Sequence, residues 1–522
     1  MKLDADDLPT DPETLRALII AERVQHAEKI ARVESERDRL RAIIRELQRH
    51  RFGRRSERLD PDQLALALED LEQLLAAAEA EEARTTGKPA TERPKTRRKT
   101  NRGDLPAHLP RIETLIDIAD RACPCCAKEM HRIGEDVAER LDMIPAQFRV
   151  LVVRRPKYAC RSCQGTVVQA PAPSRLIEGG LPTEALVAHV VVGKYADHLP
   201  LYRQAQIYTR QGIALDRSTL ADWVGRAAWF LRPLHERLLE TLRRSTKLFA
   251  DETTAPVLDP GRGRTKTGQL WAYARDDRPW GGPAPPAVAY VYAPDRKAER
   301  PMAHLQGFRG VLQVDGYAGY RTLAEAGQVQ LAFCWAHVRR RFYEIAQSGA
   351  APIATAALAR IAEIYAIEAG IRGQSAEARH AIRQEKTRPL IDGLKTWLDA
   401  QLAAVSQKSA MAEAIRYALV RWSGLIRFLD DGRIEIDSNP VERTIRPIAL
   451  NRKNALFAGS DGGGEHWAIL ASLIESCKLN AVDPQAYLAE VLARLVAGHP
   501  ANSLDDLLPW QWAANRPIQR AA

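Results

Sequence analysis

Two apolar runs that each reach an aspartate constrain the fold of this chain more than any other feature. The first run, 247–251, ends at Asp251, and the second, 310–315, ends at Asp315. Short runs of this composition predict buried strands. Two more strand-like runs lie between them at 269–274 and 287–292, and a short helix is expected at about 303–308. A further strand is expected at 330–335, just before His337, which could lie near a site built on these strands.

This order of elements is that of a ribonuclease-H-like sheet. If the first and fourth strands lie side by side, Asp251 and Asp315 meet at one edge of the sheet. An aspartate after a strand also occurs in ordinary turns, so neither acid needs a function by itself. Two such acids on strands in this order favour a catalytic pair.

Glu442 is the third candidate acid. It lies in the run Asp-Ser-Asn-Pro-Val-Glu-Arg at 437–443, where Ser438 or Asn439 can cap a helix. Glu442 can therefore be the glutamate of a capping box, or a third carboxylate brought to the two aspartates. Three clustered carboxylates repel one another unless cations lie between them. Mg²⁺ accepts few carboxylates and keeps several waters, and two ions about 3.5–4 Å apart would suit phosphoryl transfer.

Two cysteine pairs predict a structural zinc module. Two C-x-x-C knuckles can surround one Zn²⁺ with four thiolates, here from Cys123, Cys126, Cys160 and Cys163. The run 149–155 is expected to be a strand that carries the second knuckle back to the first, and Cys125 is a spare that could compete as a ligand. The alternative is a set of reduced thiols in a core. Cys334 and Cys477 stand alone and are expected to be core residues.

Residues 184–233 predict a unit that contacts DNA. A helix runs from 202 to a turn at Gly212, and a second helix begins near Arg217. This is the pattern of a helix-turn-helix, in which residues at the start of the second helix face the groove. The alternative is a plain helical connector. The residues of this unit expected to contact DNA are Arg217, Ser218 and Thr219. A second set, Arg443, Arg446 and Lys453, follows Glu442 and is also expected to contact DNA. The alternative for this second set is ordinary surface charge.

Charge and periodicity describe the N-terminal part. A long helix is expected from 12 to about 50, and a second helix carries Leu64, Leu68, Leu71, Leu75 and Ala78 at heptad spacing. This part is either a hairpin packed on its own protein or a self-association zipper. The segment 84–102 holds eight basic residues and one acid, and the chain has a net charge of 76 − 66 = +10 with a pI near 9.3. A basic chain of this kind favours a polyanionic partner.

The fold class expected is a multidomain α+β chain. We expect a zipper-like oligomerisation segment at 1–83, a basic linker at 84–110, the four-cysteine zinc module at 111–170 and the helix-turn-helix-like region at 183–240. The ribonuclease-H-like catalytic core would occupy 245–480, with a helical insertion at about 345–432, and a C-terminal helical segment and tail would occupy 481–522. The start of the chain is not a signal peptide and no apolar run is long enough to span a bilayer, which predicts a cytoplasmic protein.

Several long motifs resemble one family. They are the runs at 250–253 (ADET), 314–320 (VDGYAGY), 334–340 (CWAHVRR), 437–464 (with RKNALFAGSD at 452–461) and 504–510 (LDDLLPW). Together they resemble the DDE transposases of the insertion-sequence-sixty-six family, transposase C type. Pro440 departs from many relatives but suits the first turn of a helix.

The resemblance implies that Asp251, Asp315 and Glu442 are the DDE triad of a ribonuclease-H-like core with Mg²⁺ or Mn²⁺. It also implies a bacterial mobile element and small accessory proteins encoded beside the transposase. The function expected is therefore a DNA transposase, acting as a homo-oligomer on DNA near the nucleoid. It would cut the ends of its insertion sequence and join them to target DNA. The alternatives are a non-catalytic DNA-binding regulator and a ribonuclease-H-like nuclease that does not join.

Overall fold

The computed structural model divides into two compact units, residues 1–142 and 143–520. It describes residues 147–159, 167–177, 180–259, 264–325, 327–347, 349 and 351–515, together with Asp11, Glu13, Arg16 and Arg23. The expected N-terminal helices, the basic linker and the knuckles 123–126 and 160–163 lie outside the described residues. None of the described helices has both the length and the apolar character needed to cross a membrane.

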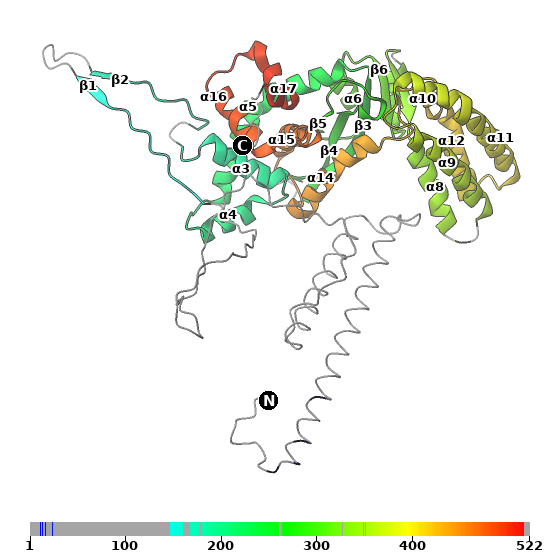
Figure 1. Cartoon of the computed structure of the whole chain (residues 1–522), viewed down its shortest axis with the longest axis horizontal. Coiled ribbons are helices and arrows are strands. Elements are labelled where there is room, and N and C mark those ends of the chain that lie inside the picture. The colour runs from blue at the N-terminus through cyan, green and yellow to red at the C-terminus, as the bar shows by residue number, and fades with distance from the viewer. Residues whose placement is uncertain are drawn as a thin grey trace, which may run out of the picture. The chain divides into compact units, whose positions relative to one another are not determined.

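A five-stranded mixed sheet lies at the centre of the second unit (Figure 1). Its strands, in the order β5-β4-β3-β6-β7, are Ala287–Ala293, Arg264–Arg275, Lys247–Asp259, Gly310–Val314 and Val329–Phe333. β3, β4 and β5 are antiparallel neighbours, while β6 is parallel to β3 and β7 is parallel to β6. All five predicted strands are present, and the expected neighbours β3 and β6 lie side by side. The chain is therefore a mixed α/β protein.

β3 is longer than the sequence predicted. It pairs with β6 only as far as Phe249 opposite Gln313, but it pairs with β4 along its length to Asp259 opposite Arg264. Asp251 therefore lies inside a strand and not at its end, which corrects the prediction. The reason is that β3 leaves the parallel half of the sheet and continues as a hairpin with β4, where it keeps its backbone hydrogen bonds.

Helices cover the antiparallel half of the sheet. α15 (Asp461–Leu479) packs on β5 and on α5 (Arg217–Arg243), and most of its residues from Trp467 onward are buried. The hydroxyls of Ser472 and Ser476 accept hydrogen bonds from the amides of Tyr290 and Val288. α15 thus satisfies backbone groups of the edge strand β5, which would otherwise remain open to another chain.

A group of helices precedes β3. α3 (Glu184–Tyr195) is followed by α4 (Leu201–Arg210), a turn at Gly212 with a φ of 82°, and then α5, so the expected order of helix, glycine-containing turn and helix is present. α5 continues past Pro233 to Arg243, beyond the predicted end of the helical region. Proline in a helix interior is costly, but here the buried Leu231, Leu234 and Leu238 hold the helix in the core.

The run 149–155 is not a strand, so that prediction is wrong. The strand pair in this region is β1 (Lys157–Ala159) with β2 (Val167–Gln169), which are antiparallel. Val150 and Val152 are 87% and 72% exposed. The apolar composition of the run favours a strand, but a strand also needs a pairing partner, and the described residues supply none.

A second hydrophobic core lies beside the parallel half of the sheet. It is formed by α8 (Trp335–Gln347), α9 (Pro352–Gly370), α11 (Arg388–Ala404), α12 (Ala410–Val420) and α13 (Trp422–Leu425). α10 (Ala376–Ile382) and a π-helical turn at Arg383–Thr387 connect α9 to α11. Val311 of β6 and Ala332 of β7 belong to the same core. The helices between β7 and residue 430 are therefore packed on the sheet itself.

The remaining elements complete the unit. They are α6 (Glu299–His304), α7 (Arg321–Glu325), α14 (Asn439–Ala455), α16 (Pro484–Val496), α17 (Pro509–Ala514), and 3-10 turns at Arg278–Trp280, Ala318–Tyr320, Arg427–Leu429 and Ala501–Leu507. α14 packs on β3 and β4.

A buried ion pair holds the second core together. The Arg383 guanidinium, which is fully buried, donates to both carboxylate oxygens of Glu368 at 2.8 and 2.7 Å and to the carbonyl of Phe428 at 2.8 Å. The neighbouring Arg379 lies 2.8 Å from Glu435. Glu435 in turn exchanges hydrogen bonds between its backbone and the side chain of Gln313 on β6. These contacts hold the segment that leads from the second core into α14 against the sheet.

We expect Glu368→Ala to lower the free energy of unfolding by about 3–5 kcal/mol, because it leaves the Arg383 guanidinium buried without a counter-charge. Urea-induced unfolding measures the change. The control is Asp399→Ala, which removes an acid from an exposed pair with Lys395 on α11 and should cost less than about 1 kcal/mol. Equal losses in the two variants would contradict a stabilising role for the buried pair.

Candidate functional site

The pairing of β3 with β6 brings Asp251 and Asp315 to the same place. Phe249 is opposite Gln313, and each aspartate lies two residues further along its strand direction. Successive side chains of a strand alternate between faces, so residues two further on lie on the same face as the paired residues. The two carboxylates therefore lie at the edge where β3 and β6 separate.

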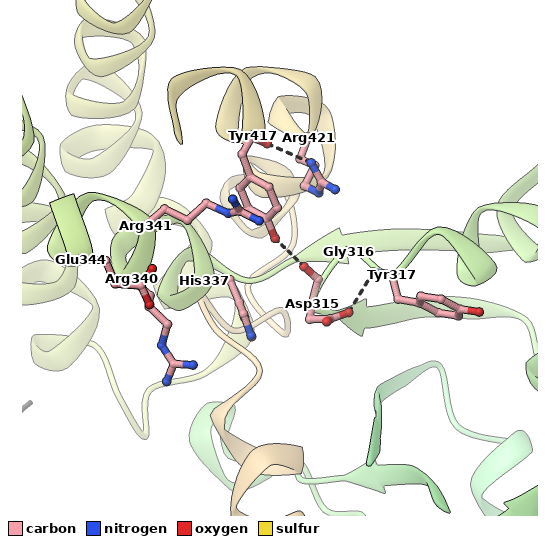
Figure 2. Close-up of a pocket in the computed structure, with 9 residues that line it drawn as sticks. All are labelled: Asp315, Gly316, Tyr317, His337, Arg340, Arg341, Glu344, Tyr417 and Arg421. Carbon is pink, nitrogen blue, oxygen red and sulfur yellow. Dashed lines mark hydrogen bonds between the residues drawn. The ribbon is translucent and has the colours of Figure 1, made fainter. Parts of the chain in front are cut away.

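The carboxylate of Asp251 has an unusual environment. Burial raises the pKa of Asp251 to about 8, and the charges of Glu252, Asp315 and Glu442 contribute in the same direction. Its side chain accepts one hydrogen bond, from the amide of Glu252 at 2.8 Å. The carboxylate of Asp315 accepts from the amide of Tyr317 at 2.9 Å (Figure 2). Within the described residues neither aspartate has an ion-pair partner.

Glu252 is an acid of this site that sequence reasoning did not single out. Its buried side chain is held by the guanidinium of Arg296, which donates from both Nε and Nη2, and by the Tyr320 hydroxyl at 3.1 Å. Glu252 therefore already has a cationic partner, whereas Asp251 and Asp315 do not. The only sequence signal was its position next to Asp251, because Arg296 is distant along the chain.

Glu442 lies in the first turn of α14. Its Oε1 accepts from the Ser438 hydroxyl at 3.0 Å and lies 3.9 Å from Nδ1 of His337. In a capping box the glutamate would accept from the backbone amide of the cap residue. Here the amide of Ser438 donates to Sγ of Cys334 at 3.3 Å, and the amide of Asn439 donates to Oδ1 of Asp437 at 3.1 Å. Neither candidate cap residue donates its amide to Glu442, so the capping-box interpretation is wrong.

The described link between Glu442 and the aspartates is electrostatic. The charge of Glu442 raises the pKa of Asp251, although burial, Glu252 and Asp315 contribute more to the shift. Among the described residues, however, the group with ligand atoms all within 4.8 Å of one another is Cys334, His337 and Glu442. His337 therefore lies beside the third acid, as the sequence suggested it could.

These donors fit a hard divalent cation. Asp251, Asp315 and Glu442 offer carboxylate oxygens, the ligands that Mg²⁺ and Mn²⁺ prefer, and neither aspartate forms an ion pair with a described side chain. A soft metal at Cys334 fits less well. Burial raises the pKa of the Cys334 thiol to about 11, so that it stays protonated, and the thiolate is the form that binds metal.

The residues predicted to contact DNA are mostly exposed. Arg217 and Ser218 are exposed at the start of α5, and Thr219 is half-buried. On α14, Arg443, Arg446 and Lys453 are exposed, and their spacing places them on one face of the helix.

Arg452 of α14 is a further residue that sequence reasoning did not identify. Its Nη1 donates to the Thr253 hydroxyl at 3.0 Å and to the Thr254 hydroxyl at 2.8 Å. These contacts fix the far end of α14 to β3 just beyond Asp251. They therefore help to hold the helix that carries Glu442.

Comparison with known proteins decides the family. A model described as "Transposase IS66 family" matches residues 179–466, which include all three acids. The chain belongs to the IS66 family of transposases. Three other models of this family match as well: "Transposase C of IS166 homeodomain" at 39–114, "zinc-finger binding domain of transposase IS66" at 120–164, and "IS66 C-terminal element" at 472–510.

Similar full-length proteins occur in Sinorhizobium fredii. The uncharacterized protein y4jD is 48% identical over the whole of both chains. The uncharacterized protein y4qI is 45% identical over 98% of this chain and 99% of its own length, and y4hP is 40% identical over 90% and 88%. The family resemblance of the motifs is thus confirmed, and the zinc-finger module of the family spans all four cysteines of the predicted zinc site.

We expect the purified IS66-family chain to carry one zinc ion, because the four thiolates of the two knuckles suit a closed structural site. Elemental analysis measures the zinc content. Cys163→Ser should abolish it, since the second knuckle has no spare cysteine. The control Cys477→Ala removes a buried thiol of α15 and should keep the zinc.

Zinc that persists in Cys163→Ser, or that is absent from the unaltered chain, would contradict the four-cysteine site.

Proposed function

We propose that this IS66-family protein is a DNA transposase that binds the ends of its insertion sequence and catalyses metal-dependent strand cleavage and strand transfer. Asp251, Asp315 and Glu442 are its catalytic acids. The observation that carries the proposal is the pair of aspartates where two neighbouring strands separate. Neither forms an ion pair among the described residues, and the pKa of Asp251 is raised to about 8. Such perturbed groups concentrate at functional sites.

The sheet supports a ribonuclease-H-like core. Three antiparallel strands, followed by two strands parallel to the first, are the order and directions expected for that fold, with the first aspartate on the first strand and the second after the fourth. The helical elements between β7 and α14 then form the insertion that we assign to about 345–432. For the other domains of the chain we propose the boundaries that were predicted from the sequence.

The three acids would hold two Mg²⁺ or Mn²⁺ ions. When bound, such ions would lower the pKa of the attacking water or hydroxyl. They would also offset negative charge on the phosphate and on the leaving oxygen. Asp251 and Asp315 would contribute carboxylate oxygens from the sheet, and Glu442 would contribute its carboxylate from α14. Water or a DNA hydroxyl would then attack the phosphodiester directly, without a covalent protein–DNA link.

The rest of the chain would bind and orient DNA. Arg443, Arg446 and Lys453 would contact phosphates beside Glu442, which fixes register but reads no sequence. Arg217, Ser218 and Thr219 would face the DNA groove from the start of α5. Cys123, Cys126, Cys160 and Cys163 would hold a structural Zn²⁺. The N-terminal segment would join copies of the chain on DNA in the bacterial cytoplasm, with small accessory proteins of the element as further partners.

We expect Asp315→Asn to lose cleavage and strand transfer by roughly a thousandfold or more, because metal-ion catalysis contributes several kcal/mol that need this carboxylate. The assay combines purified protein, labelled DNA carrying the element's ends, a target plasmid and Mg²⁺. DNA binding should persist. The control Asp399→Asn alters an exposed acid of α11 and should cut and join at the unaltered rate.

Full activity of Asp315→Asn would contradict the triad. Metal-dependent cutting by the unaltered chain without joined products would identify a nuclease. DNA binding without any scission, with the accessory proteins of the element present, would identify a regulator.

A further inference from the structure

A cavity of about 430 Å³ opens beside Asp315, on the side of the helical insertion (Figure 2). Asp315, Gly316 and Tyr317 after β6 line one side of it. The other lining residues come from α8 and from α12 and its end, namely His337, Arg340, Arg341, Glu344, Tyr417 and Arg421. Its lining includes neither Asp251 nor Glu442. The cavity thus leads from one of the catalytic acids toward the insertion, for which the sequence indicated only a scaffold.

The cavity lining has an excess of basic side chains, with the three arginines Arg340, Arg341 and Arg421 against the two acids Asp315 and Glu344. The guanidinium carbons of Arg341 and Arg421 each lie 3.9 Å from the centre of the Tyr417 ring. Two like charges held against the same ring repel one another, and a nearby anion would relieve this repulsion. Arg341 has an acidic partner, Glu413, at 3.6 Å. Within the described part of the chain, Arg340 and Arg421 have no ion-pair partner.

Arg421 is fixed in this position by its surroundings. Its Nη1 donates to the carbonyl of Tyr417 at 3.3 Å, while its buried Nε has no hydrogen-bond partner among the described residues. A buried N–H without an acceptor is costly. Because this Nε lies against Gly316, an anion in the cavity would interact with the charge of Arg421 and not with this N–H.

The turn after Asp315 is shaped to let Arg421 approach. Gly316 has a φ of 105°, and a Cβ at this position would lie 2.6 Å from Nε of Arg421. The Tyr417 hydroxyl donates to the main-chain carbonyl of Asp315 at 2.9 Å. The insertion is therefore tied to the catalytic strand end by a hydrogen bond, and glycine at 316 leaves room for the guanidinium beside it.

We propose that this cavity binds a phosphodiester group of the DNA strand that reacts at Asp315, with Arg340 and Arg421 as the principal contacts. Guanidinium groups suit phosphate oxygens because they present several donors in one plane. The volume lies in the range of about 300–1,000 Å³ typical of ligand sites, so a nucleotide-sized part of a strand can enter. The inference rests on the proposed function, because it takes the ligand of the site to be DNA. The insertion then serves as a second DNA-binding wall beside the sheet edge.

The first test is equilibrium binding of labelled DNA carrying one element end, measured over a range of salt concentrations. Loss of one charge-assisted contact should weaken binding roughly tenfold or more and reduce the slope of log affinity against log salt by about one. We expect this for Arg421→Gln and for Arg340→Gln. Since Arg421 is packed and its loss could disturb the fold, the exposed Arg340 gives an independent result.

The matched control is Arg416→Gln. Arg416 lies on α12 next to Tyr417, but its side chain contacts Gln407 and does not line the cavity. The replacement therefore removes one positive charge near the cavity without removing a cavity contact. It should keep the affinity and the salt slope of the unaltered chain. Arg421→Lys keeps the charge and should restore the slope. If both cavity variants bind DNA with the unaltered affinity and slope, the proposal is overturned.

The second test identifies which DNA strand supplies the phosphate. A neutral methylphosphonate is placed at successive positions, either in the element end or in the target strand. At one position the neutral group should weaken binding of the DNA to the unaltered chain. The same modified DNA should bind Arg421→Gln no more weakly than unmodified DNA does, because this variant already lacks the contact. A position in the element end assigns the cavity to the cut strand, and a position in the target assigns it to the strand that is joined. If neither the element end nor the target strand has such a position, the proposal is overturned.

Neither binding test requires catalysis. A chain that binds DNA but never cuts it would overturn the proposed function and leave the result for the cavity valid. A chain that cuts and joins normally with both cavity variants would overturn the inference and leave the proposed function intact.

Discussion

The parallel pairing of β3 with β6 is the interaction on which the rest of the site depends. It places two aspartates at one edge of the sheet, where burial and neighbouring carboxylates oppose ionisation of Asp251. Clustering acids in this way costs folding free energy, because like charges are brought together in a partly desolvated place. Around this pair the protein neutralises one further acid, Glu252, with Arg296, whereas neither Asp251 nor Asp315 forms an ion pair among the described residues. A sheet edge of this kind lowers the stability of the fold but is suited to binding divalent ions.

The position of the third acid depends on contacts far from it. Glu442 lies at the start of α14, and the preceding segment is held against β6 by Glu435 and Gln313. The far end of α14 is held to β3 by Arg452. The insertion is stabilised by the buried pair of Arg383 and Glu368. α8, which leads into the insertion, and the end of α12 within it carry the arginines that line the cavity beside Asp315. The insertion thus connects the sheet, the third acid and the charged cavity.

Local patterns in the sequence predicted the strands, because apolar runs bounded by turns form strands wherever neighbours are available. The same reasoning failed for 149–155, where the composition is apolar but no partner strand is present among the described residues. It also ended β3 too early, because the hairpin with β4 extends the strand through polar residues such as Thr254. Strand order and the helix-cap spacing singled out the three acids, and the family motifs then implied that they form a triad. These patterns did not reveal the contacts of Glu252 with Arg296, or of Arg421 with the turn at Gly316, because these pairs are separated in sequence and meet only through tertiary packing.

The most direct test of the central idea is the binding of Mn²⁺ to the purified chain without DNA, followed by electron paramagnetic resonance. If Asp251 and Asp315 form a cation site at the edge between β3 and β6, the unaltered protein should bind Mn²⁺ and Asp315→Asn should bind it far more weakly. The zinc content should be equal in both proteins, which excludes a change at the cysteine module. Equal Mn²⁺ binding by the two proteins would contradict the assignment of the metal site to this pair of strands.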